Sequence, residues 1–359
     1  MPRIPAAALV SILLIGPAAA GLETPAGADR LAAEIDRWSA FVASNPATDD
    51  LWKDLKEGAE PLLAQARSAL AGGRRTLALQ RLLAARANLS AAAYAQAPPA
   101  SAAKDMAAFE AEWTRMGAAL RAELAPPPAG ALAGVRPAVV RALGEAALPQ
   151  ARVFYDASLD YGRNTMPEHG LFYLGSARAA AEAVELCRSL SWPSAPNAAP
   201  VRSPQAEVEA LEGELLAAYR PPLSIDRHAD FIAASSLLKE ARELDAAGLQ
   251  HGALLRYLQA AQRFAPLRGA GVPEAPDVAA RLRDLEQRLA GGGVDHSLGR
   301  LFLERARDAL AASPPDAATA AAIASDVLPR YLAALEPARP APLRPEPRAT
   351  VTLVRWPYT

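Results

Sequence analysis

The sequence predicts an all-α protein in which irregular helical hairpins pack as a helical-repeat-like array or bundle, followed by a short extended C-terminal tail. Three observations predict this class. Alanine, leucine, arginine and glutamate dominate the chain, whereas β-branched residues are sparse. Apolar residues recur every three or four positions, which is the period of an amphipathic helix. Most of the 32 prolines lie in clusters between helical stretches, where proline ends a helix.

The first 20 residues have the features of a secretory signal peptide. Arg3 precedes an uncharged, mostly apolar stretch over 4–15, Gly16-Pro17 ends that stretch, and Ala18-Ala19-Ala20 provides a cleavage site before Gly21. The apolar stretch is shorter than the roughly 20 residues that a bilayer-spanning helix requires. We therefore predict an exported protein, periplasmic or extracellular, whose mature chain has no transmembrane segment. An uncleaved N-terminal anchor is the alternative.

The composition predicts a folded chain whose partner is not a nucleic acid. Hydrophobic residues make up 51% of the 359 residues and charged residues 21%, which is enough to build a buried core. The chain has 38 basic and 39 acidic residues, whereas affinity for nucleic acid rests on many unbalanced cations. Only four of the basic residues are lysines. Guanidinium sites for phosphate or carboxylate would explain this bias, but we favour GC-rich coding as its cause.

Clusters of proline divide the mature chain into three helical regions and a tail. Proline-rich stretches at 126–130 and 193–204 separate the regions. Beyond the third region, proline recurs at every second or third residue, which favours an extended polyproline-type spacer. The predicted parts are a signal peptide (1–20), an N-terminal helical region (21–125), a central helical region (131–192), a C-terminal helical region (205–335), a Pro-rich spacer (336–348) and a strand-like tail (349–359).

Three segments of the chain share one helical pattern. They cover 62–73, 237–248 and 302–313, and each ends at a Gly or Ser, where a helix C-cap belongs. In the first two copies the similarity continues into a second helix at the same offset. The paired positions are Ala78, Leu82, Ala85 and Leu89 in the first copy and Ala253, Tyr257, Ala260 and Phe264 in the second.

These segments predict helix–turn–helix units in which small alanines let two helices approach closely. The units resemble tetratricopeptide hairpins in general shape, but they lack the regular period of that family, so we assign no family. Stacked helical units form concave surfaces that bind peptides or proteins. Chance similarity among Ala- and Leu-rich helices is the alternative. A fragment over 154–173 is a more divergent candidate for a further hairpin.

Aromatic residues are scarce in the chain, at 6%, yet several of them gather in the central region. Aromatic walls with a few convergent polar groups are typical of small-ligand sites. At helical spacing, such residues also commonly form core. The candidate ligand-binding residues are Tyr155, Tyr161, Glu168, His169, Phe172 and Tyr173.

The last eleven residues, 349–359, are the one stretch in which a strand is predicted, because β-branched and aromatic residues are enriched there. A lone strand leaves its backbone groups without hydrogen-bond partners. It therefore pairs with the sheet edge of a partner protein, with a second copy of itself or with a groove on its own helices. A tail that packs on the helical body or stays disordered is the alternative. The candidate partner-binding residues are Val351, Leu353, Trp356 and Tyr358.

Standard catalytic, nucleotide-binding and metal-binding motifs are missing from the sequence, including H-E-x-x-H, G-x-S-x-G and Walker A. The clusters nearest to a reactive site are Glu168-His169 and the stretch from Asp226 to Asp230. In the second cluster, His228 lies two residues from each aspartate and points away from their shared helix face. We predict neither a metal site nor a cofactor.

The function that the sequence favours is an exported, non-enzymatic helical scaffold or adaptor that binds a protein or peptide partner. The alternative is a helical domain that binds a small ligand with the central aromatic residues. A hydrolase-type enzyme that uses Glu168 and His169, or Asp226 and His228, is a third and weaker possibility.

Overall fold

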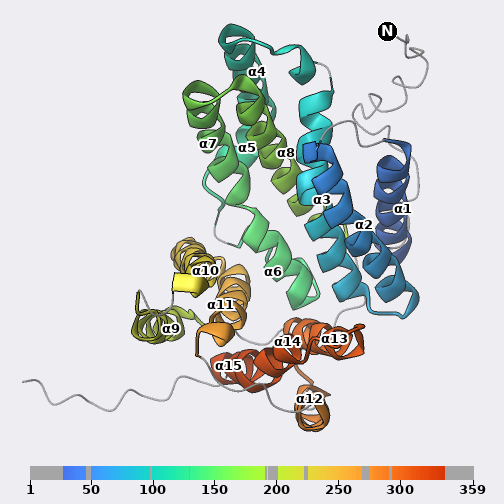
Figure 1. Cartoon of the computed structure of the whole chain (residues 1–359), viewed down its shortest axis with the longest axis vertical. Coiled ribbons are helices and arrows are strands. Elements are labelled where there is room, and N and C mark those ends of the chain that lie inside the picture. The colour runs from blue at the N-terminus through green and yellow to red at the C-terminus, as the bar shows by residue number, and fades with distance from the viewer. Residues whose placement is uncertain are drawn as a thin grey trace, which may run out of the picture.

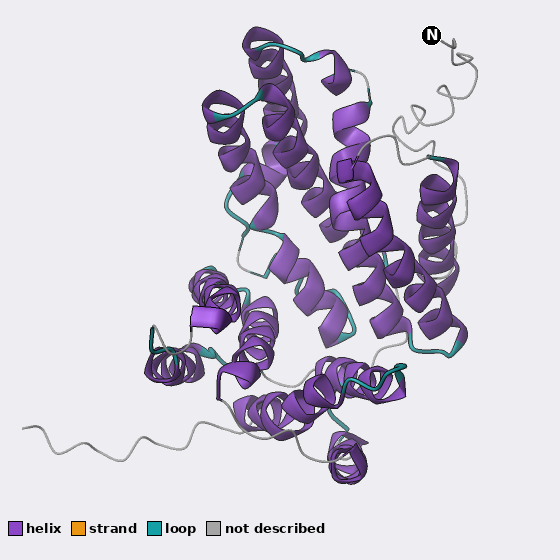
Figure 2. Cartoon of the chain, viewed as in Figure 1, coloured by secondary structure: helices purple, strands orange, loops and turns teal. Residues whose placement is uncertain are grey.

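The computed structural model describes residues 27–45, 50–97, 99–128, 130–190, 192, 201–221, 225–268, 275–290 and 293–335. All regular secondary structure in these ranges is helical, which confirms the predicted all-α class (Figure 2). None of their helices is both long enough and apolar enough to cross a bilayer. The predicted signal peptide, the Pro-rich spacer and the strand-like tail, with Val351, Leu353, Trp356 and Tyr358, lie outside the described residues.

The first eight α-helices fill the part of the chain before the second proline cluster. They are α1 (Gly27–Ser44), α2 (Asp50–Ala71), α3 (Arg75–Gln96), α4 (Met106–Ala119), α5 (Arg121–Leu124), α6 (Ala138–Ala147), α7 (Gln150–Asn164) and α8 (Pro167–Ser189). The remaining helices are the short η2 (Ala100–Ala102) between α3 and α4, and then α9 (Gln205–Ala218), η3 (Ile225–Arg227), α10 (His228–Ala246), α11 (Gln250–Phe264), η4 (Ala265–Arg268), α12 (Ala275–Ala290), α13 (Ser297–Ala311), α14 (Ala317–Ala322), the π-helical turn η5 (Ile323–Val327) and α15 (Leu328–Leu335).

The helices form two layers that α6 joins (Figure 1). In the upper layer, α3 packs between α2 and α8, and α8 packs in turn against α7. In the lower layer, α11 packs against α10 and η5, and α13 packs against α12, α14 and η5. Helix α6 contacts α8 above and α11 and α13 below. One main hydrophobic core therefore runs from Leu31 in α1 to Ala334 in α15.

The first two copies of the repeated segment form hairpins with the same turn. Helices α2–α3 and α10–α11 are the two hairpins. Gly73 and Gly248 occupy the same position in them, with φ of 75° and 74°. The residue after each glycine donates its N–H to a carbonyl five residues earlier, from Arg74 to Ala69 at 2.8 Å and from Leu249 to Leu244 at 2.9 Å. This is the Schellman arrangement that ends a helix and reverses the chain.

The third copy keeps the helix of the repeat but not its turn. Helix α13 buries Ala306 completely, as the first copies bury Ala66 and Ala241. Its C-cap residue, Ala312, has extended backbone and leads into α14 without a left-handed glycine. The fragment over 154–173 also lies in a hairpin, α7–α8.

An arginine at one position of all three copies binds the helix that precedes the copy. The three ion pairs are Arg67 with Asp36 of α1, Arg242 with Glu212 of α9, and Arg307 with Glu286 of α12. All three pairs are exposed, so each contributes little to stability. Their recurrence nevertheless shows that each copy belongs to a unit that includes the preceding helix.

We expect the turn glycines of the two hairpins to be equally intolerant of a side chain. Gly73→Ala and Gly248→Ala should each lower the free energy of unfolding by about 1 kcal/mol, because a Cβ is strained at positive φ. Gly58→Ala is the matched control, since a Cβ at this α2 position meets no atom within 4 Å, and it should raise stability by about 0.5–1 kcal/mol. Urea denaturation measures all three. Clearly unequal losses at the two turns would show that the hairpins are not equivalent.

The single cysteine, Cys187, lies fully buried in the main core, as its apolar sequence neighbours indicate. Burial raises the pKa of its thiol to about 12. Almost no thiolate therefore exists at neutral pH, and Cys187 is a packing residue rather than a nucleophile.

Candidate functional site

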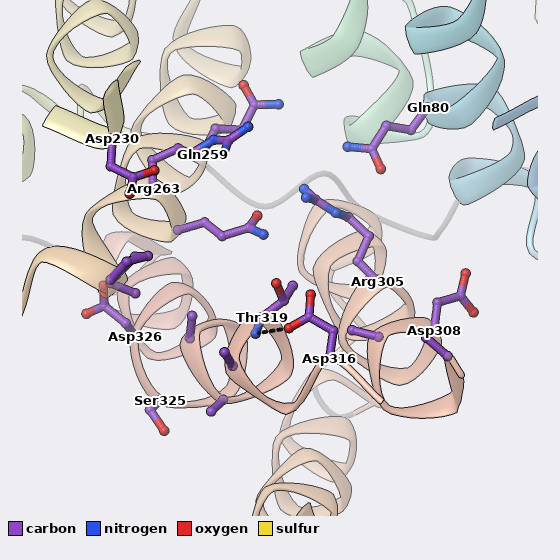
Figure 3. A pocket seen from close by; sticks show the side chains of 18 of the residues that line it. Gln80, Asp230, Gln259, Arg263, Arg305, Asp308, Asp316, Thr319, Ser325 and Asp326 are labelled. Carbon is purple, nitrogen blue, oxygen red and sulfur yellow. Dashed lines mark hydrogen bonds between the residues drawn. The ribbon is translucent and has the colours of Figure 1, made fainter. Parts of the chain in front are cut away.

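A polar groove lies where three hairpins meet (Figure 3). Its walls come from α2 and α3, from α10 and α11 with η4, and from α13, α14 and η5. Its volume is about 1520 Å³. The groove is therefore a product of tertiary packing, and its residues come from distant parts of the sequence.

The repeated segments place polar residues on the groove face. Gln65 and Ser68 of α2 line the groove. The positions that match them in the third copy are Arg305 and Asp308 of α13, which line it as well. The buried alanine of each copy lies between these two positions, so the helix keeps one face in the core and turns another toward the groove.

Side chains with hydrogen-bonding groups dominate the lining. The six basic residues are Arg74, Arg81, Arg227, Arg263, Arg268 and Arg305. The acidic residues are Asp230, Asp308, Asp316 and Asp326, and the amides are Gln65, Gln80, Gln259 and Gln262. Short residues of α14, among them Ala318, Ala321 and Ala322, leave room along one wall.

Some of the groove arginines are neutralised by neighbouring carboxylates. Arg74 forms an ion pair with Asp308 across the gap between α3 and α13. Arg268 binds Asp326, with 2.8 Å between guanidinium nitrogen and carboxylate oxygen. These pairs fix the walls of the groove relative to one another.

Three arginines of the groove have no neighbouring carboxylate in the ranges that the structure describes. Arg81 of α3, Arg263 of α11 and Arg305 of α13 have no carboxylate of the described residues within the 4.0 Å that defines an ion pair. Arg305 lies over the ring of Phe302 on its own helix, at 5.4 Å from the ring centroid. Figure 3 shows it extending from α13 toward the wall that carries Gln80.

The electrostatics of the groove reflect these unpaired cations. Burial, and then the charges of Arg81 and Arg263, lower the pKa of Arg305 to about 10. Burial also lowers the pKa of Arg81, although Asp308 opposes the effect. With a pKa of about 10, Arg305 remains charged at neutral pH, and the positive charges of Arg81 and Arg263 repel it in a partly desolvated place.

Two buried polar atoms on the α3 wall of the groove have no hydrogen-bond partner in the described part of the chain. They are Oε1 of Gln80 and Nε of Arg81. Leaving a buried polar atom without a partner costs about 1–3 kcal/mol. These two atoms therefore raise the free energy of the unbound protein.

The predicted aromatic residues separate into several environments. Tyr155 is buried and stacks on Trp113 of α4 at 4.7 Å, and its hydroxyl donates to the Trp113 carbonyl at 3.1 Å. Tyr161 and Tyr173 stack on each other at 4.3 Å, and the Tyr161 ring is 45% exposed. Phe172, on another face of α8, packs against the main core.

The polar residues predicted beside these aromatic side chains lie at the surface. Glu168 and His169 are both exposed in the first turns of α8. The nearest polar neighbour of His169 is the Thr165 hydroxyl, 3.0 Å from its Nδ1. None of the six predicted ligand-binding residues lines the groove. A small-ligand site at these residues remains a prediction.

The other histidine cluster is also exposed. Asp226 forms a pair with Arg227 at 3.5 Å, and Nδ1 of His228 lies 2.7 Å from the Tyr219 hydroxyl. Asp230 is the member of this stretch that faces the groove together with Arg227. Within the described ranges, no group of three or more His, Cys, Asp or Glu side chains is placed to hold a metal ion.

Comparison of the chain with protein-family models, with curated proteins and with solved structures finds no match.

Proposed function

We propose that the protein is an exported, non-enzymatic helical scaffold that binds an extended segment of a protein partner in the groove. The observation that carries this proposal is the size and lining of the groove between three hairpins. Its volume of about 1520 Å³ exceeds the roughly 300–1,000 Å³ that is typical of small-molecule sites. A site of this size suits several residues of a polypeptide.

The lining also suits a peptide backbone. An extended segment brings an N–H donor and a C=O acceptor at each residue, and these groups need partners when they leave water. Each glutamine side chain offers two donors and one acceptor oxygen. The four groove glutamines can therefore accept hydrogen bonds from backbone N–H groups and donate to backbone C=O groups. The alanines of α14 leave space for the segment.

Export and the lack of catalysis are parts of the proposal that rest on the sequence. The N-terminal 20 residues have the charge, apolar stretch and Ala-rich site of a signal peptide. The sequence carries none of the catalytic motifs that we sought. Stacked helical hairpins with a concave polar surface are well suited to binding a protein.

Photo-cross-linking tests the proposal. We would place p-benzoyl-phenylalanine at position 65 or 318, where exposed Gln65 and Ala318 face the groove from opposite hairpins, or at exposed Asp160 of α7 as the control. The mature chain, residues 21–359, is irradiated in envelope extract. We expect one protein partner to be cross-linked from both groove positions and not from 160.

A second set of cross-linking experiments distinguishes binding in the groove from binding by the C-terminal tail. Chains ending at residue 348 lack the strand-like segment, and the same cross-links should form from 65 and 318 if the groove carries binding. Loss of the adducts with the tail would move the binding function to residues 349–359. No adduct from either groove position, in either chain, would refute the proposed function.

A further inference from the structure

Three guanidinium groups in the groove differ from the other three arginines that line it, because Arg74, Arg227 and Arg268 each have a carboxylate partner. Arg81, Arg263 and Arg305 come from three separate helices, α3, α11 and α13, and no carboxylate of the described residues pairs with them.

An overall excess of basic residues does not explain these unpaired groups. The chain has 39 acidic residues for 38 basic ones, and acidic partners pair with arginine at the matched repeat positions Arg67, Arg242 and Arg307. Arg121 and other exposed arginines also have no ion pair among the described residues, but Arg81 and Arg305 are partly buried and Arg305 lies near enough to Arg81 and Arg263 to be repelled by both. This arrangement holds like charges close together, which raises the free energy of the unbound protein.

We infer that the groove selects an acidic segment of its partner, whose carboxylates bind Arg81, Arg263 and Arg305; this inference rests on the proposed function. Guanidinium groups bind carboxylates through two parallel N–H···O bonds, and such charge-assisted bonds are stronger than neutral ones. A bound carboxylate relieves the repulsion among the three arginines. Carboxylates at alternate residues of an extended segment lie about 7 Å apart, so one segment can reach more than one arginine.

The charges of the groove disfavour two other occupants. The chain's own residues 336–359 contain four arginines and only two glutamates, so they do not complement unpaired cations. A nucleic acid carries a negative charge at every residue, and Asp230 and Asp316, the two groove aspartates without an arginine partner among the described residues, would repel such a continuous line of phosphates. A segment with a few spaced carboxylates avoids this repulsion.

Fluorescence anisotropy tests the inference with two labelled peptides of about twelve residues. The acidic probe alternates glutamate and serine, and the matched probe has glutamine in place of each glutamate. At low salt, the mature chain should bind the acidic probe about tenfold or more tightly than the glutamine probe. The acidic complex should weaken as salt is added, because salt screens the ion pairs.

Two variants connect the binding to named residues. The double variant Arg81→Gln/Arg305→Gln should bind the acidic probe about tenfold or more weakly, with little change for the glutamine probe. Arg121→Gln, which removes an exposed guanidinium on α5 outside the groove, should bind both probes as the parent does. Thermal unfolding of the double variant should begin no lower than that of the parent, because repulsion among the three arginines is relieved.

Other outcomes show whether acid selection alone fails or whether peptide binding in the groove fails as well. Equal binding of both probes, lost on filling the groove with Ala318→Trp, would overturn acid selection and leave peptide binding in place. Binding of neither probe, or tighter binding of a single-stranded oligonucleotide, would also overturn the inference. A double variant that unfolds well below the parent would assign Arg81 and Arg305 a structural role instead.

Discussion

Replacing Glu145 by alanine is expected to lower the free energy of unfolding by about 3–5 kcal/mol. Glu145 of α6 is fully buried, and each of its two carboxylate oxygens has a partner. Oε1 accepts from Nε of Arg141 at 2.6 Å, and Oε2 accepts from the backbone N–H of Gly252 at 2.9 Å. Gly252 lies in the first turn of α11, where backbone N–H groups have no partner within the helix. The substitution leaves that N–H and the Arg141 guanidinium without this partner.

Urea denaturation followed by circular dichroism measures this loss. Glu145→Gln keeps an acceptor for the Gly252 N–H but removes the charge, so we expect a smaller loss of about 1–3 kcal/mol. The control is Glu185→Ala on α8, whose side chain is 66% exposed and pairs loosely with Arg188 at 3.9 Å. That change should cost less than about 1 kcal/mol. If Glu145→Ala cost no more than Glu185→Ala, the joining of the two layers through α6 would need a different explanation.

Replacing Arg86 by alanine is expected to cost about 3 kcal/mol. Arg86 of α3 has a side chain that is only 4% exposed, and it binds Glu182 of α8 at 2.8 Å. Its guanidinium also lies 3.9 Å from the carboxylate of Glu34 and 5.8 Å from the ring centroid of Trp38, both on α1. Truncation opens a cavity among three helices and removes a buried cation. The loss lies at the low end of the range because Glu182 keeps a second partner, Arg178, at 2.9 Å.

A second variant of Arg86 separates packing from charge, and a variant of the exposed Arg67 is the control for burial. Arg86→Leu fills much of the same volume without a charge, and buried ion pairs are often replaceable by apolar residues, so it should cost about 1 kcal/mol. Arg67→Ala removes another arginine that bridges to α1, but its pair with Asp36 is 56% and 67% exposed. It should cost less than about 1 kcal/mol. Equal losses for Arg67→Ala and Arg86→Ala would show that burial of Arg86 does not matter.

The hairpins could be predicted because their signals are local. Alanine and leucine at helical spacing define each core face. Gly73 and Gly248 mark turns that require a positive φ, which glycine adopts without strain. The match between Ala78 and Ala253, both fully buried, follows from the same spacing. Such features depend on residues within one or two helical turns, so the sequence contains them directly.

The groove could not be predicted in the same way. Arg81 and Arg305 have the same residue type and helical context as Arg67, and the chain's arginine bias, which we attributed to coding, gave no reason to separate them. Whether an arginine has an acidic partner depends on which helix packs opposite it. The repeat contained one usable signal, since Gln65 and Ser68 align with Arg305 and Asp308 on a polar face outside the core.

For the aromatic residues, closeness in the sequence predicted a grouping that the fold divides. Tyr155, Tyr161 and Tyr173 are close in sequence and were predicted to act together. Helix α4, from the preceding region, brings Trp113 against Tyr155, and this contact buries Tyr155 away from the stacked pair of exposed Tyr161 and half-buried Tyr173. Proximity in sequence therefore did not give a shared environment, because a distant helix decides which rings reach the surface.

Cross-linking from positions 65 and 318 is the most direct measurement of the central claim, that a protein segment occupies the groove. The two positions lie on different hairpins that line the groove, so a single segment bound there can reach both of them. We expect the same partner peptide, identified by mass spectrometry, to be joined to both positions, and we expect that peptide to be rich in glutamate or aspartate. A partner cross-linked as efficiently from position 160 on α7, or from neither groove position, would contradict the claim.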